Sequence, residues 1–283
     1  YVNSTLELGT IGQMYNNGDG GWSSIVPTQN LVDTYEMADG LTKEESGSYD
    51  PNHPFAGRDP RMAMTIIYPG MDWNGTVVNT LDKTINGKDN ANYPPSANNA
   101  SKTALTWRKY LDEQYANGIW NTNACPIVIR YAEVLLTYAE AVNELSGPSA
   151  DVYDKLDLIR GRVGMPKVDR EKYASKETLR RLIRRERGVE LAGEGVRRAD
   201  ILRWKDDNGK MVAETVLNGV LERVVGTVNY AETDPTKRAE IDTNAPATDK
   251  KIEDRVFKVH NRYNPIPQGA IDNNPNLEQN PGY

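Results

Sequence analysis

Glu186 and Glu190 are the residues whose type and spacing come closest to catalytic chemistry in this 283-residue sequence. A spacing of four residues is about one turn of an α-helix, so the two carboxylates lie on the same helical face. Two carboxyl groups about 5 to 5.5 Å apart are the pair that a retaining glycoside hydrolase uses. One hypothesis for this chain is therefore a glycoside hydrolase that acts through Glu186 and Glu190.

The pattern around this pair favours a second interpretation, in which both carboxylates are structural. Residues 175–204 read as a helix, a glycine-containing break and a second short helix. Glu186 and Glu190 project into the apolar side of the first helix, where a carboxylate needs a partner. Arginines close in the sequence are candidate partners: Arg160, Arg162, Arg197, Arg198 and Arg203. We expect structural ion pairs that involve Glu186, Glu190, Arg197 and Arg203, because removing one partner of a buried pair costs about 3–5 kcal/mol.

Cysteine and histidine are too few for most metal or redox centres. Cys125 is the only cysteine, which excludes an internal disulfide and a cysteine-rich zinc site. His53 and His260 are far apart in the sequence, so neither a histidine metal centre nor a Ser-His-Asp triad is expected. The NNGDGG turn at residues 16–21 lacks the twelve-residue spacing of a calcium loop. We predict no cofactor and no metal site.

Charge and hydropathy argue against two further classes of protein. The net charge is −6 and no basic block is present, which disfavours nucleic acid as a partner. No apolar run approaches the roughly 18 residues of a membrane span. The first residues lack the basic and apolar regions of a signal peptide, and the abrupt start is typical of a mature or trimmed chain.

Composition changes along the chain predict three segments. Residues 1–125 form a loop-rich lobe, in which Met62 to Tyr68 are expected as a strand or a short extended piece because prolines block a long helix. Residues 126–206 form a helical scaffold. Within it, Arg130 to Val163 have the length of one tetratricopeptide-type helix pair, which needs neighbouring helices to bury both faces. Residues 207–283 form an irregular, proline-containing segment packed on the body.

The predicted fold is mostly α and forms one structural unit. In it, tetratricopeptide-like helix pairs pack against a loop-rich, irregular lobe that carries few short strands.

Six motifs resemble the SusD/RagB family, surface lipoproteins that capture glycans for outer-membrane import. They are PTQNLVDTYEMADG (27–40), RDPRMAMTIIYPGMDWNG (58–75), RYAEVLLTYAEAVNEL (130–145), LDLIRGRVGMP (156–166), LRRLIRRERGVELAGEGVRRADILRW (179–204) and NPIPQGAIDNNPNLEQNPGY (264–283). These motifs follow the family's order and span most of the chain. The family's N-terminal part, with its lipidated cysteine and most of its repeat helices, lies outside this sequence.

The resemblance implies a function without catalysis. Proteins of this family are not enzymes: they bind oligosaccharide or polysaccharide and cover a SusC-like TonB-dependent transporter. It also implies a place on the cell outer membrane, exposed at the surface, with the lipid anchor on the part outside this sequence. The loop-rich lobe at residues 1–125 is then the part that faces the ligand.

Aromatic side chains in this lobe are the candidate glycan contacts. The chain has 15 Tyr and 5 Trp but only 2 Phe, and rigid aromatic rings with a polar tip give contact area at low entropic cost. The first candidate group is Tyr68, Asp72, Trp73 and Asn74; the second is Trp120 with Asn121 and Asn123; the third is Trp22 with Asp19. In the alternative reading these rings pin the loops to the core. For the ligand-contact reading, we expect Trp73→Ala to weaken glycan retention without changing the melting temperature.

A third class of function stays open beside glycan capture and glycoside hydrolysis. A helical-repeat adaptor would bind another protein through a concave helical face and not through aromatic loops.

Overall fold

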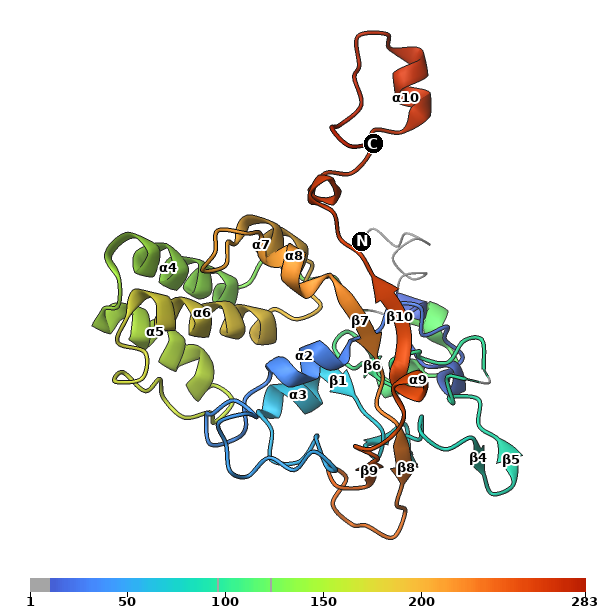
Figure 1. Cartoon of the computed structure of the whole chain (residues 1–283). Helices are drawn as coiled ribbons and strands as arrows, with labels where there is room; N and C mark the ends of the chain where they lie inside the picture. Colours follow the sequence, from blue (N-terminus) through green and yellow to red (C-terminus); the bar gives the residue numbers. More distant parts are fainter. Residues whose placement is uncertain (1–10, 96, 123) are drawn as a thin grey trace. The chain divides into compact units, whose positions relative to one another are not determined.

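The structure is a computed structural model that describes residues 11–95, 97–122 and 124–283. The chain divides into two compact units (Figure 1). The first unit contains Tyr1–Gly195 and Glu222–Ile252, and the second contains Val196–Leu221 and Glu253–Tyr283. Predicted segments 1–125 and 126–206 thus share the first unit up to Gly195, and predicted segment 207–283 is divided between the two units.

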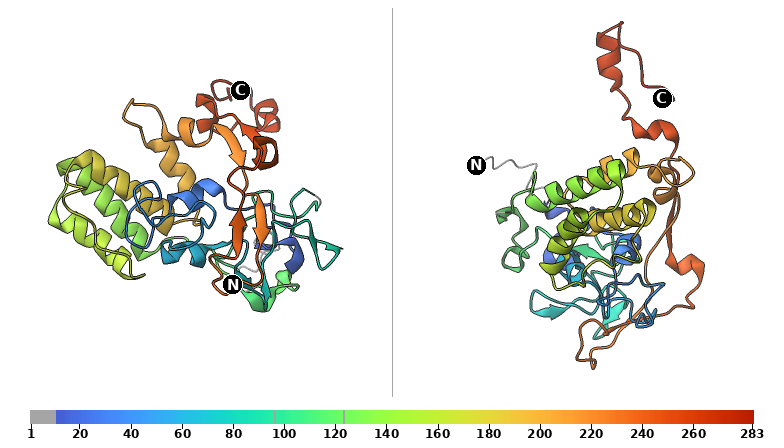
Figure 2. Two further views of the ribbon diagram at one scale, coloured as in Figure 1. Left: turned by 60° about the horizontal axis from the view of Figure 1, so that its bottom comes forward. Right: turned by 90° about the vertical axis from the view of Figure 1, so that its left-hand side faces the viewer.

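Three helices form the helical part of the first unit: α4 (Tyr131–Ser146), α5 (Ala150–Gly161) and α6 (Lys176–Glu190). α4 packs against both of the other helices (Figures 1 and 2). Ser149 caps α5 by accepting from the Val152 N–H, and Ser175 caps α6 by accepting from the Thr178 N–H. The side chains buried between these helices include Leu135, Leu136, Ala139, Val152, Leu156, Ile159, Leu179, Leu182 and Ile183. The predicted helix pair and its need for a third helix are confirmed.

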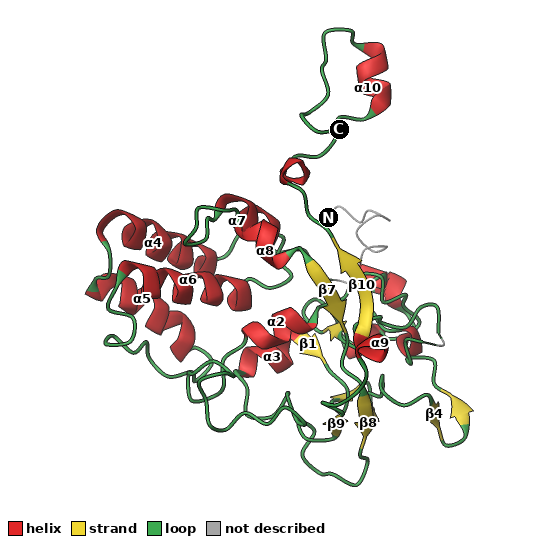
Figure 3. Ribbon diagram, in the orientation of Figure 1, coloured by secondary structure: helices red, strands yellow, loops and turns green. Residues whose placement is uncertain are grey.

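Loops and short elements make up the rest of the first unit, as the predominance of loops in Figure 3 shows. Two short helices, α2 (Gln29–Thr34) and α3 (Pro60–Thr65), pack against α6 and join the loops to the helices. Three single turns of 3-10 helix follow the chain through the loops: η1 (Asn17–Asp19), η2 (Glu113–Tyr115) and η3 (Ile119–Asn121). One core unites these segments, with Tyr15, Tyr35, Phe55, Ile66, Leu105 and Val189 among its buried members.

The strands of the first unit pair as small antiparallel ladders. The pairs are β1 (Ile66–Ile67) with β6 (Thr106–Trp107), β2 (Asp72–Trp73) with β3 (Thr76–Val77), β4 (Thr84–Ile85) with β5 (Lys88–Asp89), and β8 (Gly226–Val228) with β9 (Ala239–Ile241). A short helix, α9 (Ala247–Lys250), follows β9. The predicted mostly helical fold with few short strands is therefore confirmed.

The predicted strand over Met62 to Tyr68 is wrong for its first half. Asp59 accepts a hydrogen bond from the Arg61 N–H, and Pro60 occupies the first helical turn, so α3 begins here and continues to Thr65. A proline at this position needs no hydrogen-bond donor and has the φ angle of a helix. Only Ile66 and Ile67 are extended, where β1 pairs with β6.

The second unit has its own small apolar cluster. Its helices are α7 (Arg197–Arg203), α8 (Val212–Val216) and α10 (Gln268–Asn273), with a 3-10 turn η4 (Val259–Arg262). Ile201, Met211 and Ala213 form the buried centre, and Phe257 packs against it. β7 (Gly219–Glu222) and β10 (Lys251–Arg255) form a two-stranded pair where the chain passes between the units. No helix of the described residues is long and apolar enough to cross a membrane.

Candidate functional site

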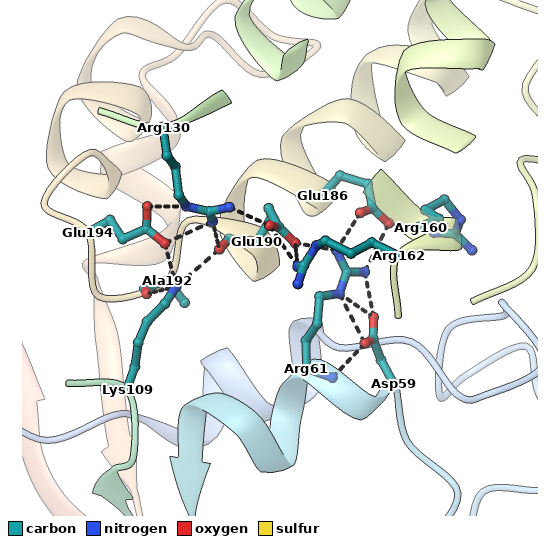
Figure 4. A network of polar contacts seen from close by, with 10 residues as sticks. All are labelled: Asp59, Arg61, Lys109, Arg130, Arg160, Arg162, Glu186, Glu190, Ala192 and Glu194. Atoms are coloured by element: carbon teal, nitrogen blue, oxygen red, sulfur yellow. Dashed lines mark hydrogen bonds and ion pairs between the residues drawn. The ribbon is translucent and has the colours of Figure 1, made fainter. Parts of the chain in front are cut away.

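Glu186 lies on α6 with its carboxylate buried between two arginines. Arg61 of α3 donates to Glu186 Oε2 at 2.9 Å, and Arg160 of α5 donates to Oε1 at 2.5 Å (Figure 4). The whole residue is only 2% exposed. Burial by itself raises the pKa of this carboxyl, but the charges and hydrogen bonds of Arg61 and Arg160 outweigh burial and hold the pKa below its ordinary value.

Glu190, one turn further along α6, is held in the same way. Its carboxylate accepts from Arg130 at 2.6 Å, from Arg162 at 2.9 Å and from Arg61 at 3.1 Å. Burial opposes ionisation here too, but these arginines keep the pKa of Glu190 lowered. Arg130 also pairs with Glu194 at 2.7 Å, and Lys109 bonds to the same glutamate, so the contacts extend beyond the end of α6 (Figure 4).

This ion-pair network, defined by Asp59, Arg61, Lys109, Arg130, Arg160, Arg162, Glu186, Glu190 and Glu194, is unsuited to acid catalysis. The general acid of a glycosidase needs a raised pKa so that it carries a proton at neutral pH. Glu186 and Glu190 have lowered pKa values and their oxygens already accept from arginine. The geometry supports a structural role for both carboxylates.

The predicted ion pairing of Glu186 and Glu190 is observed, but three of the five candidate partners are wrong: Arg197, Arg203 and Arg198, whose guanidinium donates to Asn261 and Asn264. Arg197 and Arg203 belong to α7 in the second unit, where both guanidinium groups lie over the ring of Trp204. Arg203 also pairs with Asp200 at 2.7 Å. The carboxylates of α6 instead pair with Arg160 and Arg162, which are expected because they are close to α6 in the sequence. They also pair with Arg61 and Arg130, which are too far away in the sequence to be expected.

Tyr68 and Trp73, two of the predicted ligand contacts, are buried at 2% and 4% exposure. The Tyr68 ring stacks on Phe55 with 4.6 Å between centroids, and burial raises the pKa of its hydroxyl to about 12. The Trp73 indole N–H donates to Asp19 Oδ2 at 2.8 Å. Both rings are core members, so their faces are not available to stack on a ligand.

Asp72 and Asn74 are also committed to contacts within the protein. Asp72 is exposed and pairs with Arg238 at 2.6 Å, while the Asn74 amide donates to Asp19 Oδ1 at 3.1 Å. Asp19, predicted to lie beside Trp22 as a polar contact, accepts from Asn16, Asn74 and Trp73 and is buried. Burial raises the pKa of Asp19, and its three hydrogen-bond donors partly offset this rise.

Trp22 and Trp120 come together as one aromatic pair, although the sequence places them in separate candidate groups. Their ring centroids are 5.4 Å apart and the ring planes meet at 64°, an edge-to-face contact. Trp120 is 50% exposed and Trp22 is partly buried against the core. Asn121, next to Trp120, is exposed, whereas Asn123 lies outside the described residues.

Hydrogen bonds between loops hold the aromatic pair in place. The Asn117 N–H donates to the Asp19 carbonyl at 2.7 Å, which joins the loop before Trp120 to the turn before Trp22. The Tyr15 hydroxyl donates to the Asp112 carbonyl at 3.0 Å and joins the same two loops again. Any side chain at Gly21 would meet the Tyr15 carbonyl, because a Cβ there would lie 2.3 Å from that oxygen. These hydrogen bonds and the close packing at Gly21 therefore fix the two loops that carry Trp22 and Trp120.

The sequence profile of the SusD family matches residues 3–283, and so covers both the helical scaffold and the loops that carry the aromatic pair. The chain belongs to the SusD family. A solved SusD-like carbohydrate-binding protein of Bacteroides fragilis NCTC 9343 is 31% identical, with a TM-score of 0.73 over 95% of this chain and 51% of that protein. A second SusD-like protein of the same strain is 27% identical, with a TM-score of 0.68 over 96% of this chain and 49% of that protein.

A curated relative extends the similarity to another organism. SusD-like protein P25 of Formosa agariphila is 29% identical over 214 residues, which are 72% of this chain and 37% of that protein. This SusD-family chain spans about half the length of the two solved relatives, and less of the curated one.

Proposed function

We propose that this chain captures oligosaccharide without catalysis, through the aromatic pair Trp22 and Trp120. The observation that carries the proposal is the half-exposed Trp120 ring, which makes an edge-to-face contact with the partly buried Trp22 on loops joined by hydrogen bonds. Membership of the SusD family supports it, as does the solved relative that is described as a carbohydrate-binding protein.

The geometry of the pair is suited to a sugar chain. Sugar rings present flat C–H faces with hydroxyl groups at their edges, so they bind to exposed aromatic faces beside hydrogen-bonding groups. Trp120 offers exposed ring surface for such a contact, and the partly buried Trp22 packs against it with 64° between the ring planes. A rigid pair also loses little conformational freedom when it binds.

Affinity electrophoresis in gels that contain a panel of polysaccharides tests this proposal. We expect at least one polysaccharide to retard the wild-type chain and Trp120→Ala to lose most of that retardation. Tyr131→Ala provides the matched control, because Tyr131 is an exposed aromatic residue, at 68%, on α4 and is not a member of the aromatic pair. Equal retardation of wild type and Trp120→Ala would contradict the role of the pair.

Glycoside hydrolysis is the rival function, and the ion-pair network disfavours it. Both Glu186 and Glu190 are buried and bound by arginine, with pKa values lowered. We therefore propose that the bound polysaccharide is released unchanged. Incubation of wild-type protein with each retained polysaccharide, followed by analysis of reducing ends, checks this directly. Cleavage that depends on Glu190 would contradict it.

We further propose delivery of the captured glycan to a SusC-like TonB-dependent transporter at the bacterial outer surface. The support is the family resemblance, and the lipid anchor is expected on a part of the protein outside this sequence. Cross-linking of the full-length protein in its native host, followed by identification of the cross-linked partner, tests the assignment. An adaptor for another protein would instead cross-link to a partner that is not a transporter.

A further inference from the structure

A pocket of about 300 Å³ lies in the first unit. Its walls come from the turns that follow β3 and β5, from the residues just before β8 in the sequence, and from α9. Its lining includes Leu81, Tyr93, Pro94, Pro95, Arg223 and Asp249. This volume is at the lower end of the range for small-molecule sites, about 300–1,000 Å³. The pocket therefore has room for one small ligand or one unit of a larger ligand.

The lining combines apolar rings with groups that hydrogen-bond. Tyr93 and the two prolines provide rings, whereas Arg223 and Asp249 bring a guanidinium and a carboxylate. Among the residues that the structure describes, neither the Arg223 guanidinium nor the Tyr93 hydroxyl has a hydrogen-bond or ion-pair partner. The Asp249 carboxylate accepts from the neighbouring Thr248 hydroxyl at 3.3 Å, through one oxygen. Donors and acceptors thus remain for a ligand.

Buried amides fix the turn that carries Tyr93. The Asn90 side chain donates to the carbonyls of Asn79 and Asp82 at 2.9 and 2.8 Å, and the Tyr93 N–H donates to the Asn90 carbonyl at 3.1 Å. Asn79 and Asn90 are 3% and 6% exposed. A site whose walls are already fixed loses little entropy when a ligand binds.

Backbone contacts also fix the opposite wall and join the pocket to the aromatic pair. The Arg223 N–H donates to the Lys250 carbonyl at 2.9 Å, next to Asp249. The Asn17 side chain donates to the Ala91 carbonyl and the Gly18 N–H donates to Asn92 Oδ1, both at 2.8 Å. The turn that carries Tyr93 is therefore bonded to the turn that precedes Trp22.

We propose that this pocket binds a single neutral sugar unit, in addition to the contact made by the aromatic pair. A guanidinium donates two parallel hydrogen bonds, which suits adjacent hydroxyl groups, and a carboxylate accepts from hydroxyls. Tyr93 and the prolines offer apolar surface for a C–H face of the sugar. The Asp249 carboxylate disfavours an acidic sugar, although Arg223 alone would attract one. This inference rests on the proposed glycan capture and assigns a second contact to it.

Saturation-transfer NMR with free monosaccharides tests the pocket apart from the aromatic pair. The probes are glucose, galactose, mannose and N-acetylglucosamine, with galacturonate as the acidic comparison. We expect at least one neutral sugar to bind and to lose about tenfold in affinity in Arg223→Met and in Asp249→Asn, since each variant removes a charged hydrogen-bond partner. Trp120→Ala is expected to keep this binding. Arg170→Met is the matched control, because Arg170 is an exposed arginine outside the pocket lining.

The possible failures are distinguishable. The pocket proposal is overturned by absence of monosaccharide binding, by preference for galacturonate, or by equal affinity in wild type and the two pocket variants with unchanged melting temperatures. If polysaccharide gels still retard the wild-type chain in those cases, glycan capture stands and only the pocket assignment is wrong. If no polysaccharide retards the wild type and no sugar binds, both proposals are wrong.

Discussion

At the scale of single residues, Trp73 is a candidate ligand contact in the sequence but a buried core residue in the structure. Its ring is 4% exposed and its indole N–H bonds to Asp19, which is itself buried. The original expectation for Trp73→Ala, weaker retention with an unchanged melting temperature, is therefore reversed. We now expect a loss of about 3–5 kcal/mol in the free energy of unfolding, as is typical when a buried tryptophan is truncated.

Chemical denaturation of Trp73→Ala measures this loss. Trp120→Ala is the control of the same type of substitution, because Trp120 is already 50% exposed and little core volume is lost. We expect Trp120→Ala to weaken retention in a folded protein, and Trp73→Ala to destabilise the fold. Equal stability of the two variants would contradict the burial of Trp73 as the deciding factor.

Glu190 presents the second residue-scale prediction. Glu190→Gln keeps the size of the side chain but removes the charge that Arg61, Arg130 and Arg162 share. Breaking a buried ion pair completely costs about 3–5 kcal/mol, and the loss here is expected to be smaller, because Arg61 keeps Asp59 and Glu186 and Arg130 keeps Glu194. We expect the melting temperature of Glu190→Gln to drop clearly, with retention on polysaccharide gels preserved at low temperature. Loss of retention without loss of stability would place Glu190 in the binding function.

At the scale of elements, α4 has two apolar faces and only one of them is covered. Leu135, Leu136 and Ala139 face α5 and α6 and are buried, while Tyr131, Val134, Tyr138 and Leu145 are exposed at 68%, 50%, 44% and 86%. A helix periodicity read from sequence cannot separate these faces, because both consist of apolar residues at helical spacing. The packed structure separates them.

Leucine-to-alanine substitutions on the two faces measure this difference. Leu136→Ala is expected to lower the free energy of unfolding by about 2–5 kcal/mol, since Leu136 is fully buried and a cavity would remain. Leu145→Ala is its matched control and is expected to change stability by less than about 0.5 kcal/mol. Thermal denaturation of both variants decides the matter. A larger effect of Leu145→Ala would mean that the exposed face is covered in solution.

The sequence predicts elements well where local signals agree and fails where the deciding partner is distant. The helix pair from Arg130 to Val163 is predictable from periodicity and from the cap at Ser149. The helix α3 is missed because six residues are too few for periodicity to appear, although Asp59-Pro60 is a helix start in hindsight.

Long-range contacts explain the errors in the candidate sites. Arg61 is 125 residues from Glu186 in the sequence, and no local pattern indicates their pairing. Trp22 and Trp120 are 98 residues apart, so each looks like an isolated ring until the loops are folded. Burial of Tyr68 and Trp73 likewise depends on the core that Phe55 and Asp19 help to build. Residue type indicates aromatic rings as candidate ligand contacts, but the packing of the folded chain determines which of those rings are accessible.

At the scale of the whole molecule, carboxylates with lowered pKa values make stability depend on acid. Glu45, Glu144, Glu186 and Glu190 all have a folded pKa below the ordinary value of 4.5, because lysine or arginine side chains pair with them. A lowered folded pKa gives stability that is present above the unfolded pKa and is lost as the pH falls towards the folded pKa. Asp19, with a raised pKa, acts in the opposite direction but is a single group.

The free energy of unfolding is therefore expected to fall steadily as the pH is lowered from 5 to 3, and denaturant titrations at several pH values measure it. Glu190→Gln supplies the internal test. A protonated Glu190 resembles glutamine in charge, so the stability difference between wild type and this variant should be largest near pH 7 and shrink in acid as Glu190 takes up its proton. A difference that stays constant from pH 7 to pH 3 would show that the ionised carboxylate of Glu190 does not stabilise the fold, and the ion-pair network would then owe its stability to its other members.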